Sequence, residues 1–342
     1  MGNLKIVYVG HLKMQDIRRT LLKTLILAPL FAESALAQSQ SYTVMIITFR
    51  GLTTAEQGFM DFLNSRLKVE FLIRDVEGNR SLIKNFITEA KAKKVNLVYT
   101  FGTSVTLDVV GALGKIDPEV HLTDIPVVFN IVADPVGAGL ANSFSATGRN
   151  LTGVSHIVPI PDQLRLMHRF KNTQKLAVIY NSFEANSILS VDQLRQHASM
   201  FKFELLEAPL VSGQKPKIEE IRDVMDKLVL RNPDFLYIPS DSSIIERAST
   251  IIEIAHNARV PTISATEDPI RNDGAILGLV SNYYNAGAFA GYKAEKILLG
   301  QEKIETISIE TLQRFALLVN MKSARRLEIY PPLDLIKIAE II

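Results

Sequence analysis

The segment Val44-Met45-Ile46-Ile47-Thr48-Phe49 decides the fold class of this chain. It is short and almost wholly apolar, which is typical of a strand buried on both faces of a parallel sheet. Similar runs recur at residues 69–76, 97–101 and 127–132, and residues 82–93 between them carry a helical apolar pattern. Strands that alternate with helices predict an α/β domain with a parallel sheet.

The second half of the chain repeats this pattern. Further apolar runs occur at residues 176–180, 203–210, 235–239 and 261–265. Residues 97–104, followed later by Asp134-Pro135, correspond in order and spacing to residues 235–242, followed later by Asp268-Pro269. A length of 342 residues, at about 150 residues per domain, also predicts two domains. We therefore predict two α/β domains related by duplication, with the general similarity of α/β domains as the alternative explanation.

The composition excludes several classes of protein. Hydrophobic residues make up 47% and charged residues 22%, which is ordinary for a globular chain that buries a core. The absence of Cys excludes disulfides, thiol catalysis, Cys-ligated zinc, iron–sulfur clusters and a Cys-linked lipid anchor. The six His are scattered without metal-ligand spacing. We therefore predict no metal site and no cofactor.

Residues 1–37 are predicted to form a secretory signal peptide. A basic stretch precedes an apolar run at 21–32, and Ala35-Leu36-Ala37 forms a small-x-small cleavage site. This run is too short to span a bilayer. The segment carries a net charge of +3 and the whole chain +2, so residues 38–342 carry −1 and give no electrostatic argument for nucleic acid or an anionic membrane. We expect a periplasmic monomer that is not inserted in the membrane after cleavage.

Polar residues follow two corresponding strands. Gly102, Thr103 and Ser104 open a helix, where free backbone N–H groups favour an anion such as a carboxylate. The segment Ser240-Asp241-Ser242 has the same place in the second half. Ligands bind beyond the carboxyl ends of strands in open parallel sheets, so both segments predict a ligand site. N-capping of the two helices is the alternative for each residue.

Motifs of common enzymes are missing from the sequence. The first strand is not followed by Gly-x-Gly-x-x-Gly, and the chain contains no P-loop and no Gly-x-Ser-x-Gly. Asp134 and Asp268 leave one hypothesis, a carboxylate pair of a hydrolase. Asp-Pro after a strand is more often a turn, which argues against this pair.

Several of these segments carry a family resemblance. The most specific one is Ile125-Pro126-Val127-Val128-Phe129-Asn130-Ile131-Val132-Ala133-Asp134-Pro135-Val136-Gly137-Ala138-Gly139-Leu140. Others are residues 150–155, Gly274-Ala275, Tyr283-Tyr284 and residues 296–300. Through them the chain resembles the substrate-binding proteins of a bacterial ABC transporter family that includes tryptophan and tyrosine importers. The resemblance covers nearly all of residues 42–342.

The resemblance implies a two-lobed periplasmic binding protein of type 1, with three crossovers between the lobes. Lobe 1 would contain residues 42–157 and 282–312, and lobe 2 residues 158–281 and 313–342. Such proteins trap a small ligand by hinge closure and present the closed form to a membrane permease. They perform no chemistry, so the resemblance implies that the protein is not an enzyme. The expected function is capture of a small ligand, such as an apolar or aromatic amino acid, for an ABC importer.

The resemblance also implies site residues. Gly102, Thr103 and Ser104 would hold a carboxylate, and Asn181 and Asp134 would lie at the site. Ser240, Asp241 and Ser242 replace a loop that the family often writes Thr-Asp-Asn. Asn282 stands where the family often has Asp, so either a ligand amine would depend more on Asp241 or the ligand is not an amino acid. Phe49, Phe101 and Tyr283 would stack on the ligand, with a place in the core as the alternative for each.

Two other functions remain open from the sequence. A sensory module of the same fold would signal to a receptor in place of a permease. A periplasmic hydrolase would use Asp134 and Asp268.

Overall fold

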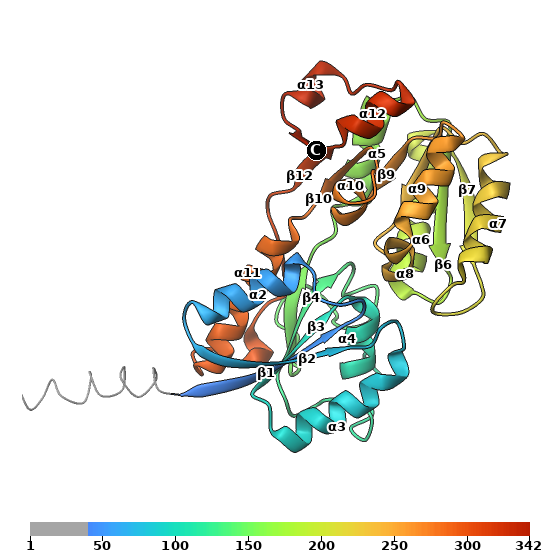
Figure 1. Ribbon diagram of the computed structural model, residues 1–342. Helices are drawn as coiled ribbons and strands as arrows, with labels where there is room; N and C mark the ends of the chain where they lie inside the picture. Colours follow the sequence, from blue (N-terminus) through green and yellow to red (C-terminus); the bar gives the residue numbers. More distant parts are fainter. Residues whose placement is uncertain (1–39) are drawn as a thin grey trace, which may run out of the picture. The chain divides into compact units, whose positions relative to one another are not determined.

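The computed structural model describes residues 40–342, and the predicted signal peptide lies outside these residues. The described residues form two β-sheets with helices packed against them (Figure 1). None of the described helices has the length and apolar character needed to cross a membrane.

The first sheet has six strands in the order β11-β5-β4-β3-β1-β2. Their bounds are β1 Ser41–Thr48, β2 Lys68–Asp75, β3 Leu97–Phe101, β4 Val127–Val132, β5 Leu151–Ser155 and β11 Glu310–Thr311. The pairs from β11 to β1 are parallel. The associated helices are α2 Thr54–Asn64, α3 Ile83–Lys93, α4 Thr103–Val110 and α11 Tyr283–Leu298. Strands β3, β4 and β5 are buried along their whole length, which explains their continuous apolar sequence.

The second sheet has seven strands in the order β13-β12-β10-β9-β8-β6-β7. Their bounds are β6 Lys175–Asn181, β7 Glu204–Leu210, β8 Phe235–Ile238, β9 Thr262–Ser264, β10 Leu277–Val280, β12 Ala316–Val319 and β13 Glu340–Ile341. The helices are α5 Ile160–Phe170, α6 Ala185–Phe201, α7 Ile218–Val229, α8 Ser242–Glu246, α9 Ala248–Asn257, α10 Asp268–Arg271, α12 Met321–Leu327 and α13 Leu333–Ile336. Only the β10–β12 pair among these strands is antiparallel.

Helices α2 and α11 approach one another so closely that only glycine fits at two crossing points. A Cβ on Gly58 would overlap the carbonyl oxygen of Tyr284, and a Cβ on Gly287 would overlap that of Ala55. This contact holds α11 on the first sheet although the preceding strand, β10, belongs to the second.

The chain passes between the sheets three times. It leaves the first sheet after β5, returns after β10 with α11, and leaves again between β11 and β12. The predicted α/β architecture with two parallel sheets and three crossovers is therefore confirmed, whereas the lobe boundaries at 157/158, 281/282 and 312/313 stay predictions. The short strands β11, β12 and β13 were not predicted.

Candidate functional site

A cavity lies where the carboxyl ends of both sheets meet. It combines residues at or just after the ends of β1, β3 and β4 of the first sheet with residues that follow β6 and β8 of the second. Its lining is Phe49, Arg50, Phe101, Gly102, Thr103, Ser104, Val105, Ile131, Glu184, Asn186, Ser240, Ser242, Ile245 and Tyr283. This position, beyond the strand ends, is where open parallel sheets bind ligands.

The start of helix α4 forms one wall. Gly102 adopts φ +80°, a conformation that favours glycine, and its N–H donates to the carbonyl of Asn130 at 2.9 Å. Gly102 is the N-cap residue, and no side chain caps the helix. The hydroxyl of Thr103 is buried without a hydrogen-bond partner. This wall therefore offers hydrogen-bond donors to an anion.

Glu184 forms the opposite wall. It lies just before α6, is 2% exposed, and its Oε2 accepts a hydrogen bond from Ser104 Oγ at 2.5 Å. Its Oε1 has no partner. Burial, followed by the nearby charge of Asp241, raises the pKa of Glu184 from 4.5 to about 7. An unpaired carboxylate oxygen in so dry a place is an acceptor for a cation.

Asn186 and Ser240 continue this wall. The amide nitrogen of Asn186 donates to the carbonyl of Ser240, and its Oδ1 is buried without a partner. The hydroxyl of Ser240 pairs with Nε2 of His156 at 2.9 Å. Burial lowers the pKa of His156 from 6.5 to about 4, so this ring is neutral at pH 7.

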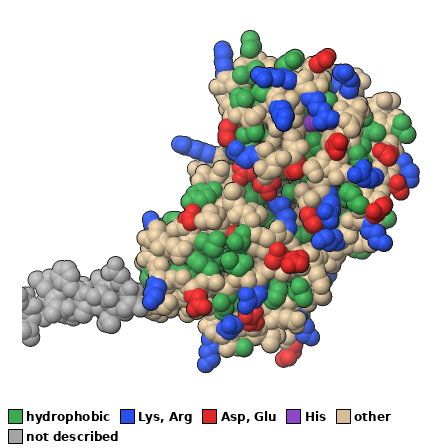
Figure 2. Space-filling view, in the orientation of Figure 1, with side chains coloured by type: hydrophobic (Ala, Val, Ile, Leu, Met, Phe, Trp, Pro, Cys, Tyr) green, Lys and Arg blue, Asp and Glu red, His purple; other side chains and the backbone are tan. Residues whose placement is uncertain are grey.

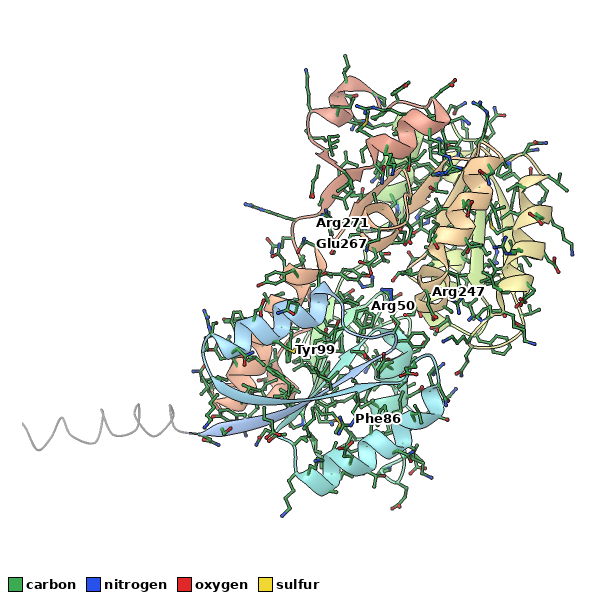
Figure 3. All side chains as sticks on the ribbon, viewed as in Figure 1. Arg50, Phe86, Tyr99, Arg247, Glu267 and Arg271 are labelled. Atoms are coloured by element: carbon green, nitrogen blue, oxygen red, sulfur yellow. The ribbon has the colours of Figure 1, made fainter. Side chains whose placement is uncertain are left out.

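Arg50 closes one side of the cavity. Its guanidinium pairs with Asp268 of the second sheet's α10 at 3.0 Å and lies over the ring of Phe101 at 5.7 Å. Figure 3 labels Arg50 at the edge of the first sheet's elements that faces the second sheet's helices. Tyr283, at the start of α11, meets Phe101 edge to face at 6.4 Å. Phe49, Val105, Ile131 and Ile245 add further apolar side chains to the lining.

Unpartnered polar atoms concentrate in this cavity. Among residues 40–342, seven buried side-chain polar atoms have no hydrogen-bond partner, and four of them belong to cavity residues: Arg50 Nε, Thr103 Oγ1, Glu184 Oε1 and Asn186 Oδ1. Buried polar groups are normally paired, so this concentration needs an explanation. Two of the atoms are acceptors, one is a donor and one is a hydroxyl, which suits a ligand carrying both a cation and an anion.

Eight of the twelve residues predicted from the sequence line the cavity. They are Phe49, Phe101, Gly102, Thr103, Ser104, Ser240, Ser242 and Tyr283. The other four, Asp134, Asn181, Asp241 and Asn282, lie outside the lining. The roles of all twelve in ligand binding stay predictions.

The four residues outside the lining hydrogen-bond to other groups of the protein. Asp134 Oδ1 accepts from the N–H of Gly137 at 2.8 Å, and Asn282 caps α11 through the N–H of Asn285 at 2.9 Å. Asn181 donates from its backbone to Asp241 at 3.0 Å.

Asp241 is fully buried and is the N-cap of α8. Its carboxylate accepts from the N–H of Asn181, the hydroxyl of Ser187, the hydroxyl and N–H of Ser243, and the N–H of Ile244. These donors already use the acceptor capacity of the carboxylate. The structure thus gives Asp241 the capping role that the sequence left as the alternative.

Arg50, Glu184 and Asn186 were not predicted as site residues. Glu184 follows the predicted strand 176–180 by only a few residues, so its place after a strand end was a usable signal. Arg50 directly follows the first predicted strand, so its position was a signal of the same kind.

Lys and Arg are interspersed with Asp and Glu over the visible face, in keeping with the near-neutral net charge (Figure 2).

Within residues 40–342, no group of His, Cys, Asp or Glu has the arrangement of a metal site.

Comparisons with known proteins agree with this geometry. Residues 44–341 match the family described as ABC transporter substrate binding protein. The tyrosine-binding protein of Clostridioides difficile is 26% identical over 274 residues, which are 80% of this chain and 73% of that protein.

Two solved structures share the fold. A conserved domain protein of Vibrio cholerae has a TM-score of 0.79 at 22% identity, over 88% of this chain and 99% of that one. An ABC domain from Streptococcus pneumonia in complex with L-Trp has a TM-score of 0.76 at 21% identity, over 87% and 100%. The likeness confirms the predicted fold of a type 1 periplasmic binding protein.

The hydrolase hypothesis is wrong. Neither Asp134 nor Asp268 lines the cavity, and Asp268 is paired with Arg50. The family match extends over nearly all described residues, and the family binds its substrates without converting them. The chain belongs to the ABC transporter substrate-binding protein family.

Proposed function

We propose that this protein captures a free α-amino acid with an apolar or aromatic side chain and delivers it to the permease of an ABC importer. The observation that carries the proposal is the set of four buried, unpartnered polar atoms on the wall of one cavity. A zwitterion supplies the partners that these atoms lack.

The ligand's ammonium would bind at Glu184 and Asn186. Glu184 Oε1 and Asn186 Oδ1 are buried acceptors without partners, and they come from the same helix start. A charged hydrogen bond in a dry site is shorter and stronger than a neutral one. This proposal gives Glu184 the role that the sequence assigned to Asp241, whose oxygens are occupied.

The ligand's carboxylate would bind at the start of α4. The hydroxyl of Thr103 and the uncapped backbone N–H groups of this helix supply donors. Arg50 adds positive charge on the same side of the cavity.

The ligand's side chain would lie against the apolar part of the lining. Phe49, Phe101 and Tyr283 offer ring surfaces for an aromatic or aliphatic group. A relative that binds tyrosine and a structural neighbour that holds L-Trp support an aromatic ligand.

Capture would occur by closure of two lobes, in a monomer in the periplasm. The predicted signal peptide supports export. The lobes would be residues 42–157 with 282–312 and residues 158–281 with 313–342, because these ranges follow the sheet membership of the strands. The match to a transporter family favours import over receptor signalling.

The test is ligand identification followed by titration. Freshly purified protein is denatured, and the released small molecules are identified by mass spectrometry. Calorimetry on refolded protein then measures binding of L-Tyr, L-Trp, L-Phe, L-Leu and a sugar as control. Binding of an apolar or aromatic amino acid supports the proposal, whereas binding of none of these amino acids would contradict it.

A further inference from the structure

Ile131 stands out in the backbone of the described residues. Its φ is +56°, in the left-handed region that β-branched residues avoid. The six other non-glycine residues of residues 40–342 with positive φ are Glu77, Lys94, Lys202, Asn232, Arg259 and Glu328. All six are exposed and unbranched at Cβ, whereas Ile131 is 4% exposed and lines the cavity.

A buried chain of hydrogen bonds holds Ile131 in this conformation. The N–H of Ile131 donates to Oδ1 of Asn130 at 3.0 Å, and Nδ2 of Asn130 donates to the hydroxyl of Tyr99 at 3.2 Å. Tyr99 in turn donates to Oε1 of Glu56 at 2.7 Å. Figure 3 labels Tyr99 inside the first sheet's half of the protein, away from the cavity residue Arg50.

The same chain reaches a second part of the cavity wall. Glu56 Oε2 accepts from the N–H and the hydroxyl of Thr53, both at 2.7 Å, which fixes the short loop after Arg50. The network thus joins the loop that carries Arg50 to the strand end that carries Ile131. The side chains of Glu56, Tyr99 and Asn130 are all buried, so the arrangement is rigid.

The strained residue is also an extra residue in the strand. Asn130 pairs with Val154 and Val132 with Ser155, so Ile131 is the additional residue of a bulge in β4. Bulges re-aim a side chain at a site, and strain of this kind persists only where the surroundings enforce it. Here it places a branched aliphatic side chain on the cavity wall.

We infer that Ile131, positioned by Asn130, sets the size of the ligand side chain that the cavity accepts. This inference rests on the proposed function. A smaller residue at 131 enlarges the apolar part of the cavity and leaves the polar atoms of Thr103, Glu184 and Asn186 in place. The substitution should therefore change the relative affinities for large and small amino acids.

The test compares Ile131→Ala with Val132→Ala. Val132 is the next residue, is fully buried and does not line the cavity, so its truncation is a matched control. Calorimetry measures the dissociation constants of L-Val, L-Leu, L-Phe, L-Tyr and L-Trp for wild type and both variants. Ile131→Ala should shift the ratio of large-ligand to small-ligand affinity toward large ligands by tenfold or more, and Val132→Ala should leave that ratio unchanged.

Asn130→Ala tests the positioning role. It does not line the cavity, yet it should shift the same ratio in the same direction, whereas a merely structural role would lower the melting temperature alone. Ratios that stay constant in both Ile131→Ala and Asn130→Ala overturn the inference and leave the proposed function standing. Wild-type protein that binds none of the five amino acids overturns both.

Discussion

Ser104 donates a hydrogen bond to Glu184 at 2.5 Å across 80 positions of sequence. Ser104 lies in α4 of the first sheet's half, and Glu184 lies at the start of α6, which follows β6 of the second sheet. Both side chains are buried. The carboxylate that we assign to the ligand ammonium therefore also joins the two halves, so ligand binding and closure involve one group.

Glu184→Gln should weaken amino acid binding about 30-fold or more. Removing one partner of a buried charge pair typically costs about 2–5 kcal/mol. Without ligand, the variant should melt at the same temperature or higher at pH 8, because it no longer buries a carboxylate. Calorimetry and thermal melts measure the two effects. Glu207→Gln, on β7 and outside the cavity, is the control, and equal affinities in both variants would remove Glu184 from the ammonium site.

The pH dependence of ligand affinity should follow Glu184. Its pKa is raised from 4.5 to about 7, so at pH 5 the carboxyl is protonated and must lose a proton to bind an ammonium. Affinity should therefore rise between pH 5 and 7 and then level off, with proton release on binding detectable in buffers of different ionisation enthalpy. In Glu184→Gln the rise should be absent.

The contribution of Glu184 to the free energy of unfolding without ligand should fall as pH rises, whereas the ligand affinity rises. A raised folded-state pKa means that the unfolded chain loses the proton first, so the Glu184 contribution is present below pH 4.5 and is lost as pH rises through about 7. His156, whose pKa is lowered to about 4, has the opposite sign and loses stability as pH falls below 6.5. The difference in melting temperature between wild type and Glu184→Gln isolates the Glu184 effect. A difference that does not vary from pH 5 to 8 would contradict it.

Asp241→Asn should lower stability far more than affinity. The carboxylate accepts from several buried donors, and an amide presents a nitrogen to some of them. A buried unsatisfied donor costs about 1–3 kcal/mol, and 1 kcal/mol shifts the melting temperature of a protein of this size by about 2–4 °C, so the melting temperature should fall by roughly 2–12 °C. The exposed Asp223→Asn is the control. A stable variant with strongly reduced affinity would restore Asp241 as the ammonium partner.

The elements of the fold were predictable where a short sequence window contains the decisive pattern. The predicted strands at 97–101 and 127–132 match β3 and β4, because burial on both faces demands a continuous apolar run. Gly102 and Thr103 were found for a similar reason, since they directly follow a strand end.

Roles that depend on distant partners were not predictable. Arg50 is fixed by Asp268, which is 218 positions away, and Glu184 by Ser104. The left-handed backbone of Ile131 depends on Asn130, which Tyr99 and Glu56 hold from other elements, so residues 125–140 alone do not predict it. Strand β12 is too short for a period to be recognised.

Asp268→Asn should weaken the contact between the two halves. The Arg50–Asp268 ion pair joins elements of different sheets, and its side chains are 13% and 22% exposed. A partly exposed pair contributes about 1 kcal/mol, so the affinity of Asp268→Asn for the ligand should be about fivefold lower. Small-angle scattering without ligand should give a larger radius of gyration than wild type. Glu89→Gln breaks the Arg74–Glu89 pair within one half and should leave the radius unchanged.

The same scattering experiment tests closure itself. A ligand that contacts both halves favours the closed state, so the radius of gyration should decrease when ligand is added to ligand-free protein. An unchanged radius with binding confirmed by calorimetry would contradict closure.

Thr103→Val should weaken amino acid binding about tenfold without loss of stability. The Thr103 hydroxyl is buried without a partner, so the isosteric valine removes a donor for the ligand carboxylate but no bond within the protein. A hydrogen bond to a charged group contributes about 1.5–3 kcal/mol. Thr106→Val in the same helix is the matched control, because its hydroxyl bonds to Thr100 at 2.9 Å and to the carbonyl of Gly102 at 2.6 Å. This control should lower the melting temperature and keep the affinity, and the reverse pattern in the two variants would remove Thr103 from the carboxylate site.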